Sequence, residues 1–124
     1  MNLLLDTHIF IWWCDNNQQI TPSLRAAIEE ADKVFVSMAS AWEAAIKVSL
    51  GKLRLPLPFP EGIEASGFHV LPIAFLHADR VASLPRHHGD PFDRMLIAQA
   101  QVERLTLVTA DPHLKPYDVP IVWA

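Results

Sequence analysis

Short runs of apolar residues alternate along this chain with longer segments in which apolar positions recur every three or four residues. Short continuous runs are typical of strands buried on both faces of a sheet, and the longer spacing is typical of helices. The pattern predicts strands at residues 2–5, 33–37, 68–73, 105–109 and 119–123. It predicts helices at 7–14, 21–31, 39–51, 60–66, 74–84 and 91–104, with a single helical turn at 111–116.

Strands that alternate with helices indicate the α/β class, with a parallel sheet covered by helices on both faces. At 124 residues the chain has the usual size of one domain, so we expect a single domain over residues 1–124. In open sheets of this kind, ligands bind beyond the carboxyl ends of the strands. That edge is therefore where functional side chains are expected.

Composition narrows the class of protein. The formal net charge of −4 argues against a protein that coats nucleic acid through a broad basic surface, but it allows a local site where metal ions offset acids. The single cysteine, Cys14, cannot form an internal disulfide, so we expect a cytoplasmic protein in which this thiol is buried. No apolar stretch approaches the roughly 20 residues of a membrane span, so no membrane contact is expected.

Acidic residues flank the predicted strands at the edge where ligands are expected. Asp6 follows the first strand, Glu43 lies in the helix after the second, and Asp111 closes the stretch LTLVTAD. Asp90 and Asp93 open the helix before the fourth strand, in HHGDPFDRMLIAQAQ. Because the carboxyl ends of parallel strands meet at one edge, we expect most of these acids to gather there.

Most of these acids also have an ordinary explanation. Asp90 and Asp111 each precede a proline, which is typical of a helix start. Glu43 forms a capping box with the serine three residues before it, an explanation that weakens if the helix begins earlier, and Lys47 lies at ion-pair spacing. Asp6, between three leucines and another apolar segment, is poorly placed for a solvated surface.

Clustered carboxylates repel one another, by about 4 kcal/mol for a pair about 4 Å apart at an effective dielectric constant of about 20. Such a cluster either takes up protons or binds a cation. Oxygen ligands without sulfur suit hard divalent cations, Mg²⁺ or Mn²⁺. In nucleases, ions held by such carboxylates activate water and promote the hydrolysis of phosphodiester bonds. The acids therefore indicate a metal-dependent site for phosphate chemistry.

Four segments of the chain resemble a known family, the PIN-domain ribonucleases, and above all their VapC type, the toxin half of bacterial toxin–antitoxin pairs. In order along the chain, the similar segments are LLLDTHIFIWW, VSMASAWEAAIKVSLGKLRL, GDPFDRMLIAQAQ and LTLVTAD. The resemblance runs from Asp6 to the final strand, and DPFDR followed by VTAD is a specific combination.

The resemblance implies a three-layer α/β/α sandwich with a central parallel sheet of about five strands. It also implies an endoribonuclease that uses one or two Mg²⁺ or Mn²⁺ ions, forms a homodimer and is inhibited by a cognate antitoxin. The metal-binding acids of the family correspond to Asp6, Glu43, Asp93 and Asp111. Asp90 then looks like a helix cap or a supporting acid. Hydrogen bonds to carboxylates or waters, or equally local capping, are expected for Thr7, Ser37 and Thr109.

Positive charge near the crevice would meet the backbone of RNA. The candidates are Lys47, Lys52, Arg54, Arg86 and Arg94. For any one of them, an ordinary solvated charge or an ion pair is the alternative.

Three histidines lie near the acids in the sequence but lack the spacing of a zinc ligand set: His8, His87 and His88. Plain loop residues are expected at 87 and 88, with a contact to substrate phosphate as the alternative. Apolar surroundings predict core or dimer contacts, rather than stacking on bases, for Trp12, Trp13 and Trp42.

Two other functions stay open. One is a phosphatase or phosphoacceptor domain with Asp6 as nucleophile, although His8 stands where haloacid-dehalogenase-like phosphatases carry a second aspartate. The other is a non-catalytic module that binds another protein and uses the acids structurally. A covalent phosphoryl-aspartate would favour the first, and a lack of divalent-ion binding would favour the second.

Overall fold

The computed structural model describes residues 1–124, and its strands are β1 (Asn2–Leu5), β2 (Lys33–Ser37), β3 (His69–Leu71), β4 (Thr106–Thr109) and β5 (Ile121–Trp123). They form one sheet in the order β3-β2-β1-β4-β5, and every neighbouring pair is parallel. Strands β3 and β5 are shorter than predicted. Pro72 and Pro120 bound them, because proline lacks the N–H that a longer ladder requires.

Six helices and one short turn connect the strands: α1 (Thr7–Cys14), α2 (Pro22–Glu30), α3 (Met38–Ser49), α4 (Phe59–Ser66), α5 (Phe75–Ser83), α6 (Pro91–Glu103) and a 3₁₀ turn at Pro112–Leu114. Helices α1, α3 and α6 begin with side chains that accept hydrogen bonds from backbone N–H groups of the first turn, namely Asp6, Ser37 and Asp90. Since α3 begins directly after Ser37, Glu43 lies in its second turn and does not form the predicted capping box with Ser40.

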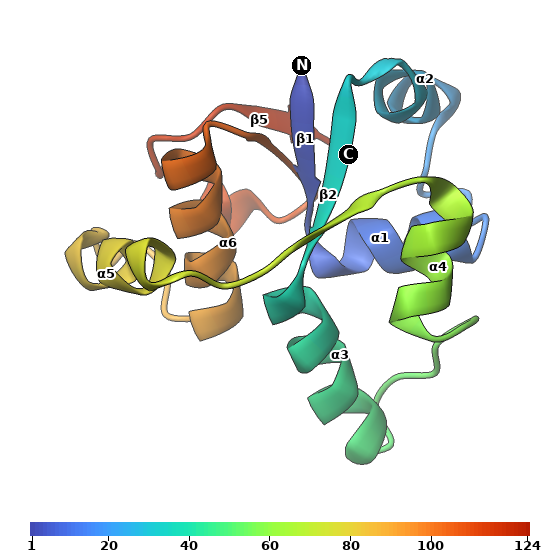
Figure 1. The fold of residues 1–124 in the computed structure, drawn as a ribbon, viewed down its shortest axis with the longest axis horizontal. Coiled ribbons are helices and arrows are strands. Elements are labelled where there is room, and N and C mark those ends of the chain that lie inside the picture. Colours follow the sequence, from blue (N-terminus) through green and yellow to red (C-terminus); the bar gives the residue numbers. More distant parts are fainter.

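Helices α1 and α4 lie on one side of the central strands and α5 and α6 on the other (Figure 1). The side chains of β1 alternate between two hydrophobic cores, one on each face of the sheet. Leu3 and Leu5 pack with apolar residues of α1, α2 and α4, whereas Leu4 packs with residues of α6 on the opposite face. Helix α5 packs in turn against α6. The predicted three-layer α/β/α sandwich with a five-stranded parallel sheet is therefore confirmed.

The strand order places a topological switch at the centre of the sheet. From β1 the chain builds outward through β2 and β3, and it then returns to the other side of β1 for β4 and β5. At such a switch the connections that follow two neighbouring strands diverge to opposite faces, which leaves a crevice beyond the carboxyl ends. Asp6, directly after β1, and Thr109, the last residue of β4, stand at this point.

Several apolar side chains lie on the surface. Trp42 is 61% exposed and meets Phe92 edge-on at 5.0 Å between ring centroids, so a place in the core is wrong for this residue. Trp12 and Trp13 pack against the core, and Cys14 beside them is half-buried.

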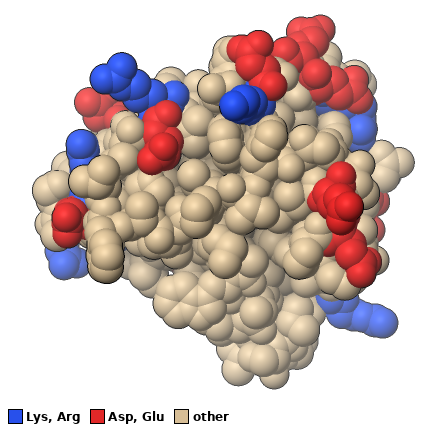
Figure 2. Space-filling model, viewed as in Figure 1, with Lys and Arg blue, Asp and Glu red and all other residues tan.

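In Figure 2 the charged side chains lie mainly near the margins of the face in view, and its middle is almost free of them. No helix has the length and apolar character needed to cross a bilayer.

Candidate metal centre and active site

The four acids predicted as metal ligands line one pocket beyond the carboxyl ends of the central strands. This pocket, here called the acid pocket, has a volume of about 320 Å³, and none of its ten lining residues is hydrophobic. They are Asp6, Thr7, His8, Glu43, Lys47, His88, Asp90, Asp93, Asp111 and His113. The switch point of the sheet thus gathers five carboxylates from four separate segments of the sequence.

Asp6 is almost fully buried, and both of its carboxylate oxygens have partners. Oδ1 accepts a hydrogen bond of 2.9 Å from the N–H of Ile9, and Oδ2 accepts one from the hydroxyl of Thr109. Burial raises the pKa of Asp6 above its usual value, and repulsion from Glu43 acts in the same direction against these hydrogen bonds. Thr109 therefore holds a carboxylate, and its oxygen also accepts a hydrogen bond of 3.1 Å from the N–H of Asp111, so both expected alternatives occur.

Glu43 projects from the second turn of α3 and is also buried. Its Oε1 accepts a hydrogen bond of 2.6 Å from the hydroxyl of Thr7, and its Oε2 lies 2.9 Å from the ammonium group of Lys47. Thr7 therefore also holds a carboxylate. Ser37 does not line the pocket and accepts a hydrogen bond from the N–H of Ala39, so local capping is its role.

The two acids at the start of α6 have different environments. Oδ1 of Asp90 accepts hydrogen bonds of 2.9 Å from the N–H groups of Phe92 and Asp93, which makes Asp90 the cap of the helix. Asp93, inside the first turn, turns toward the pocket. Burial raises its pKa to about 6; repulsion from Asp90 and Glu43 adds to this rise, and the hydrogen bond with His88 opposes it.

Asp111 lies at the outer side of the pocket. Its Oδ1 accepts a hydrogen bond of 2.9 Å from the N–H of His113 and lies 2.8 Å from Nδ1 of the same residue. Partial burial acts to raise the pKa of Asp111, but these hydrogen bonds and the charges of His113 and His88 outweigh it, so the pKa is lowered. Asp111 therefore stays ionised more readily than Asp6 and Asp93.

His88 belongs to the pocket, so the expectation of a plain loop residue is wrong for it. Its Nε2 lies 2.9 Å from Oδ2 of Asp93, and its ring stacks on that of His113 with centroids 5.0 Å apart. His87 instead meets Tyr117 edge-on. The loop before α6 necessarily ends at this edge of the sheet, which could have drawn attention to both histidines. The sequence does not reveal which of two adjacent rings points inward.

Of the five basic candidates for RNA contact, only Lys47 lines the acid pocket. Lys52, Arg54 and Arg86 are exposed but lie outside its lining. Arg94 is wrong as a candidate, because it is buried and its guanidinium donates hydrogen bonds to backbone carbonyl groups, including those of Val81, Leu84 and Pro85. It ties α6 to the end of α5 and the loop that follows.

The donor set fits a divalent cation. The lining holds five carboxylates and three imidazoles but only one ammonium group, that of Lys47. The pKa values of Asp6 and Asp93 are raised, mainly because burial removes water from these carboxylates, and repulsion from neighbouring acids adds to the rise. The residues whose ligand atoms all lie within 4.8 Å of one another are His88, Asp93 and Asp111. Oxygen from the acids and nitrogen from histidine are both ligands of divalent ions.

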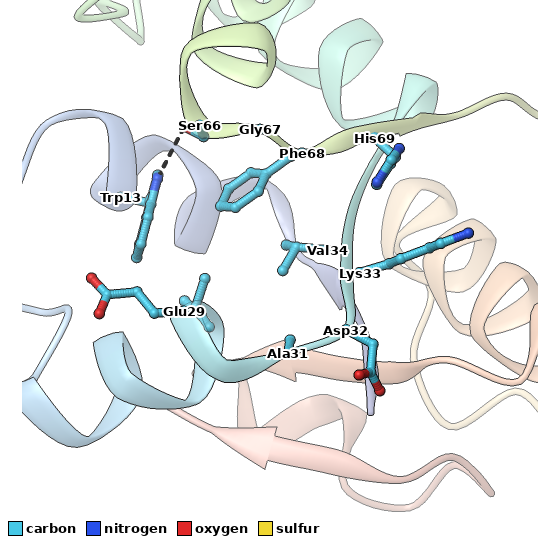
Figure 3. A pocket seen from close by; sticks show the side chains of 11 residues that line it. Trp13, Glu29, Ala31, Asp32, Lys33, Val34, Ser66, Gly67, Phe68 and His69 are labelled. Atoms are coloured by element: carbon cyan, nitrogen blue, oxygen red, sulfur yellow. Dashed lines mark hydrogen bonds between the residues drawn. The ribbon is translucent and has the colours of Figure 1, made fainter.

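A second cavity, here called the amino-edge cavity, lies where β2 and β3 begin (Figure 3). Its volume is about 280 Å³, and its walls include Trp13 and Phe68, whose ring centroids are 5.4 Å apart. The indole N–H of Trp13 donates a hydrogen bond of 3.0 Å to Ser66. Of its two acids, Glu29 and Asp32, the latter is bonded to the N-terminal ammonium group. This cavity lacks a cluster of carboxylates.

Comparisons with known proteins agree with this geometry. The sequence model of the PIN domain family matches residues 3–120. Ribonuclease VapC22 of Mycobacterium tuberculosis is 30% identical over 121 residues, which are 95% of this chain and 93% of that protein. In fold, VapBC2 from Rickettsia felis bound to a promoter DNA fragment matches with a TM-score of 0.70, 13% identity and 98% of each chain covered. A toxin–antitoxin complex from Klebsiella pneumoniae matches with a TM-score of 0.67 and 20% identity, over 97% of this chain and 95% of that one. The chain therefore belongs to the PIN-domain family and to its VapC type.

Proposed function

We propose that this chain is a metal-dependent endoribonuclease and the toxin of a toxin–antitoxin pair. The observation that carries the proposal is the acid pocket, in which Asp6, Glu43, Asp93 and Asp111 come together at the switch point of the sheet. The name of the relative VapC22, a ribonuclease, supports RNA as the substrate. Hydrolysis of a phosphodiester bond is the reaction that such a set of acids favours.

The four acids would hold one or two Mg²⁺ or Mn²⁺ ions. Such ions, when bound, offset the charge on phosphate oxygens and lower the pKa of water. The protein supplies the orientation: Thr109 and the N–H of Ile9 fix Asp6, and Thr7 fixes Glu43. Hydrogen bonds of this kind keep carboxylates in place before the substrate arrives.

The proposal includes protein partners. The solved structures with the same fold include VapBC and toxin–antitoxin complexes, which supports a cognate antitoxin as a partner of this chain. Phe75 and Leu76 at the start of α5 are 93% and 67% exposed, and Trp42 on α3 is exposed as well. Exposed apolar side chains of this size are typical of protein contacts and support the expected homodimer.

The test is RNA cleavage by the purified protein, freed of antitoxin, on a panel of tRNA, rRNA and mRNA. We expect cleavage with Mg²⁺ or Mn²⁺, none with excess EDTA, and recovery when the ion is added back. Cleavage that is indifferent to EDTA would contradict the metal dependence. Absence of cleavage on every RNA, with divalent-ion binding also absent in calorimetry, would favour the non-catalytic binding module instead.

The phosphoacceptor alternative requires a second acidic group beside the nucleophile Asp6. His8 stands where haloacid-dehalogenase-like phosphatases carry a second aspartate, so that acid is missing here. Trapping of a phosphoryl group on Asp6 would nevertheless overturn this reading. Mass spectrometry after incubation with a phosphodonor is the measurement.

A further inference from the structure

We propose that His88 is a nitrogen ligand of the divalent cation that Asp93 and Asp111 bind, so that this chain prefers Mn²⁺, Co²⁺ or Ni²⁺ to Mg²⁺. The inference rests on the proposed function, because it takes the acid pocket as the metal centre. It goes further because it names a nitrogen ligand beside the carboxylate oxygens, and it names the class of ion that this nitrogen selects.

The distances fit adjacent ligands of one ion. Nε2 of His88 and Oδ2 of Asp93 are 2.9 Å apart. Two ligands at right angles, each about 2.1 Å from an ion, are separated by about 3 Å. An oxygen of Asp111 completes the group of three, in which every pair of ligand atoms lies within 4.8 Å. One cation can therefore reach all three side chains.

The backbone of His88 is fixed in place although it lies in a loop. Its N–H donates a hydrogen bond of 2.9 Å to the hydroxyl oxygen of Tyr117, and its carbonyl accepts one of 3.2 Å from the same hydroxyl. The guanidinium of Arg94 lies 3.4 Å from that carbonyl as well. The buried Arg94 and Tyr117 thus hold the histidine at the pocket, where a preorganised ligand is needed.

The orientation of the ring matches the role of a ligand. Nε2, the nitrogen that would bind the ion, points at the carboxylate of Asp93, and the ring face stacks on His113 at an angle of 14°. His113 in turn contacts Asp111 through Nδ1, so it positions both partners. A ligating imidazole must present a free lone pair, so a bound cation would replace the hydrogen bond between His88 and Asp93.

An imidazole ligand changes which ion is preferred. Mg²⁺ binds oxygen almost exclusively, whereas affinity for a site with nitrogen rises from Mn²⁺ through Co²⁺ to Ni²⁺. The inner side of the pocket offers the oxygens of Asp6 and Glu43, and the imidazole of His8 lines it as well. Of the imidazoles in the lining, His88 is the one grouped with two carboxylates within 4.8 Å, so the preference for transition-metal ions should arise there.

Calorimetry of the full chain with Mg²⁺, Mn²⁺ and Ni²⁺, without RNA, tests the inference. His88→Gln retains an N–H that can bond to Asp93 but offers no imidazole nitrogen, and His87→Gln is the matched control outside the pocket. We expect His88→Gln to lose at least about tenfold in Ni²⁺ affinity, with Mg²⁺ affinity changed by less than about threefold. His87→Gln should match the wild type. Equal losses for all three ions, or no loss, would overturn the inference.

Pulsed electron paramagnetic resonance of bound Mn²⁺ provides a direct readout of nitrogen ligands. We expect ¹⁴N coupling to Mn²⁺ in the wild type and in His8→Gln, and its loss in His88→Gln. Coupling that survived in His88→Gln but vanished in His8→Gln would overturn the inference. If Mg²⁺-dependent RNA cleavage then continued, the proposed function would stand while this inference fell.

Discussion

Two cavities of similar size lie at opposite edges of the same sheet, and their linings differ in kind. The acid pocket, of about 320 Å³, has no hydrophobic lining residue, whereas five of the eleven residues around the amino-edge cavity, of about 280 Å³, are hydrophobic. In the first, carboxylates face one another; in the second, Asp32 is bonded to an ammonium group. Size therefore does not distinguish the two cavities, but uncompensated charge does.

The direction of the helices explains why the carboxyl edge can hold this charge. Helices α1, α3 and α6 begin there, and the free N–H groups of a first turn carry partial positive charge. Asp6 and Asp90 accept hydrogen bonds from these groups and line the pocket at the same time. The amino edge receives the ends of α2 and α4, whose free carbonyl groups favour positive charge. Capping is therefore compatible with the ligand role proposed for Asp6.

The largest difference between the two cavities should appear when one charge is removed from each of them. Asp6→Asn keeps an oxygen for the cap of α1 but loses a ligand charge, and we expect RNA cleavage to fall at least about a hundredfold, the upper range for residues that only support ligands. Asp32→Asn, in the amino-edge cavity, should leave cleavage unchanged. The measurement is the initial rate on one RNA substrate. Full activity of folded Asp6→Asn would remove this residue from the site.

Metal binding should stabilise the protein through the acid pocket alone. At an Mn²⁺ concentration about one hundred times the dissociation constant, the free energy of unfolding should rise by about 2.7 kcal/mol. Urea titrations with and without the ion measure it. Asp32→Asn should keep this gain and Asp111→Asn should lose most of it. A gain that survived in Asp111→Asn but vanished in Asp32→Asn would place the ion at the wrong edge.

Two arginines, the buried Arg94 and the half-buried Arg25, extend the comparison to packing. Arg94→Met should lower the free energy of unfolding by about 2–3 kcal/mol, because several buried carbonyl groups lose their donor. The guanidinium of Arg25 lies 4.9 Å from the ring centroid of Trp13, beside the amino-edge cavity. Arg25→Met should lower the free energy of unfolding by only about 0.5–1 kcal/mol. Urea unfolding gives both values. Similar costs would show that Arg94 does not hold the loop.

In the metal-free protein, Asp93 in the acid pocket and Asp32 in the amino-edge cavity should change stability with pH in opposite directions. The pKa of Asp93 in the folded chain, about 6, lies above its ordinary value of 3.8, so the native state binds this proton more tightly. Stability due to this group is therefore greatest at low pH and falls as pH rises from about 4 to about 6. At pH 7, the free energy of unfolding of Asp93→Asn should exceed that of the wild type by about 1–2 kcal/mol. This figure allows for the part of the side chain that water reaches, which weakens the effect.

Asp32 shows the reverse, because its hydrogen bond and charge interaction with the N-terminal ammonium lower its pKa. Its contribution is present above the ordinary pKa of an aspartate and is lost as pH falls through the lowered value. Asp32→Asn should therefore destabilise slightly at neutral pH. Unfolding curves at several pH values, with EDTA present, measure both variants. A loss of stability in Asp93→Asn at pH 7 would contradict the raised pKa of Asp93 and the burial and repulsion that cause it.

The sequence predicted what depends on local pattern. Strand and helix positions follow from the spacing of apolar residues, and the acids could be placed together because each lies next to the carboxyl end of a strand. Thr7 and Thr109 were predicted to hold carboxylates for the same reason, with local capping as the alternative. Their hydrogen bonds to Glu43 and Asp6 link residues whose strands are neighbours in the sheet.

What the sequence did not predict depends on side-chain direction in three dimensions. Arg94 follows Asp93 by one residue, and on a helix this places its side chain in the interior and not in the pocket. There its guanidinium donates a hydrogen bond to the carbonyl group of Pro85. His88 and His113 enter the pocket from loops, which have no periodicity that would fix a direction. Trp42 has apolar neighbours in sequence, yet the adjacent Glu43 occupies the buried face of α3.

The location of bound manganese tests the central claim most directly. Crystals grown with Mn²⁺ and measured at a wavelength where manganese scatters anomalously should show the ion in the acid pocket. We expect carboxylate oxygens of Asp93 and Asp111, and of Asp6 or Glu43, directly or through water, with direct bonds of about 2.1 Å. Manganese that bound only at other surfaces, with the acid pocket intact and empty of it at saturating concentration, would contradict the account.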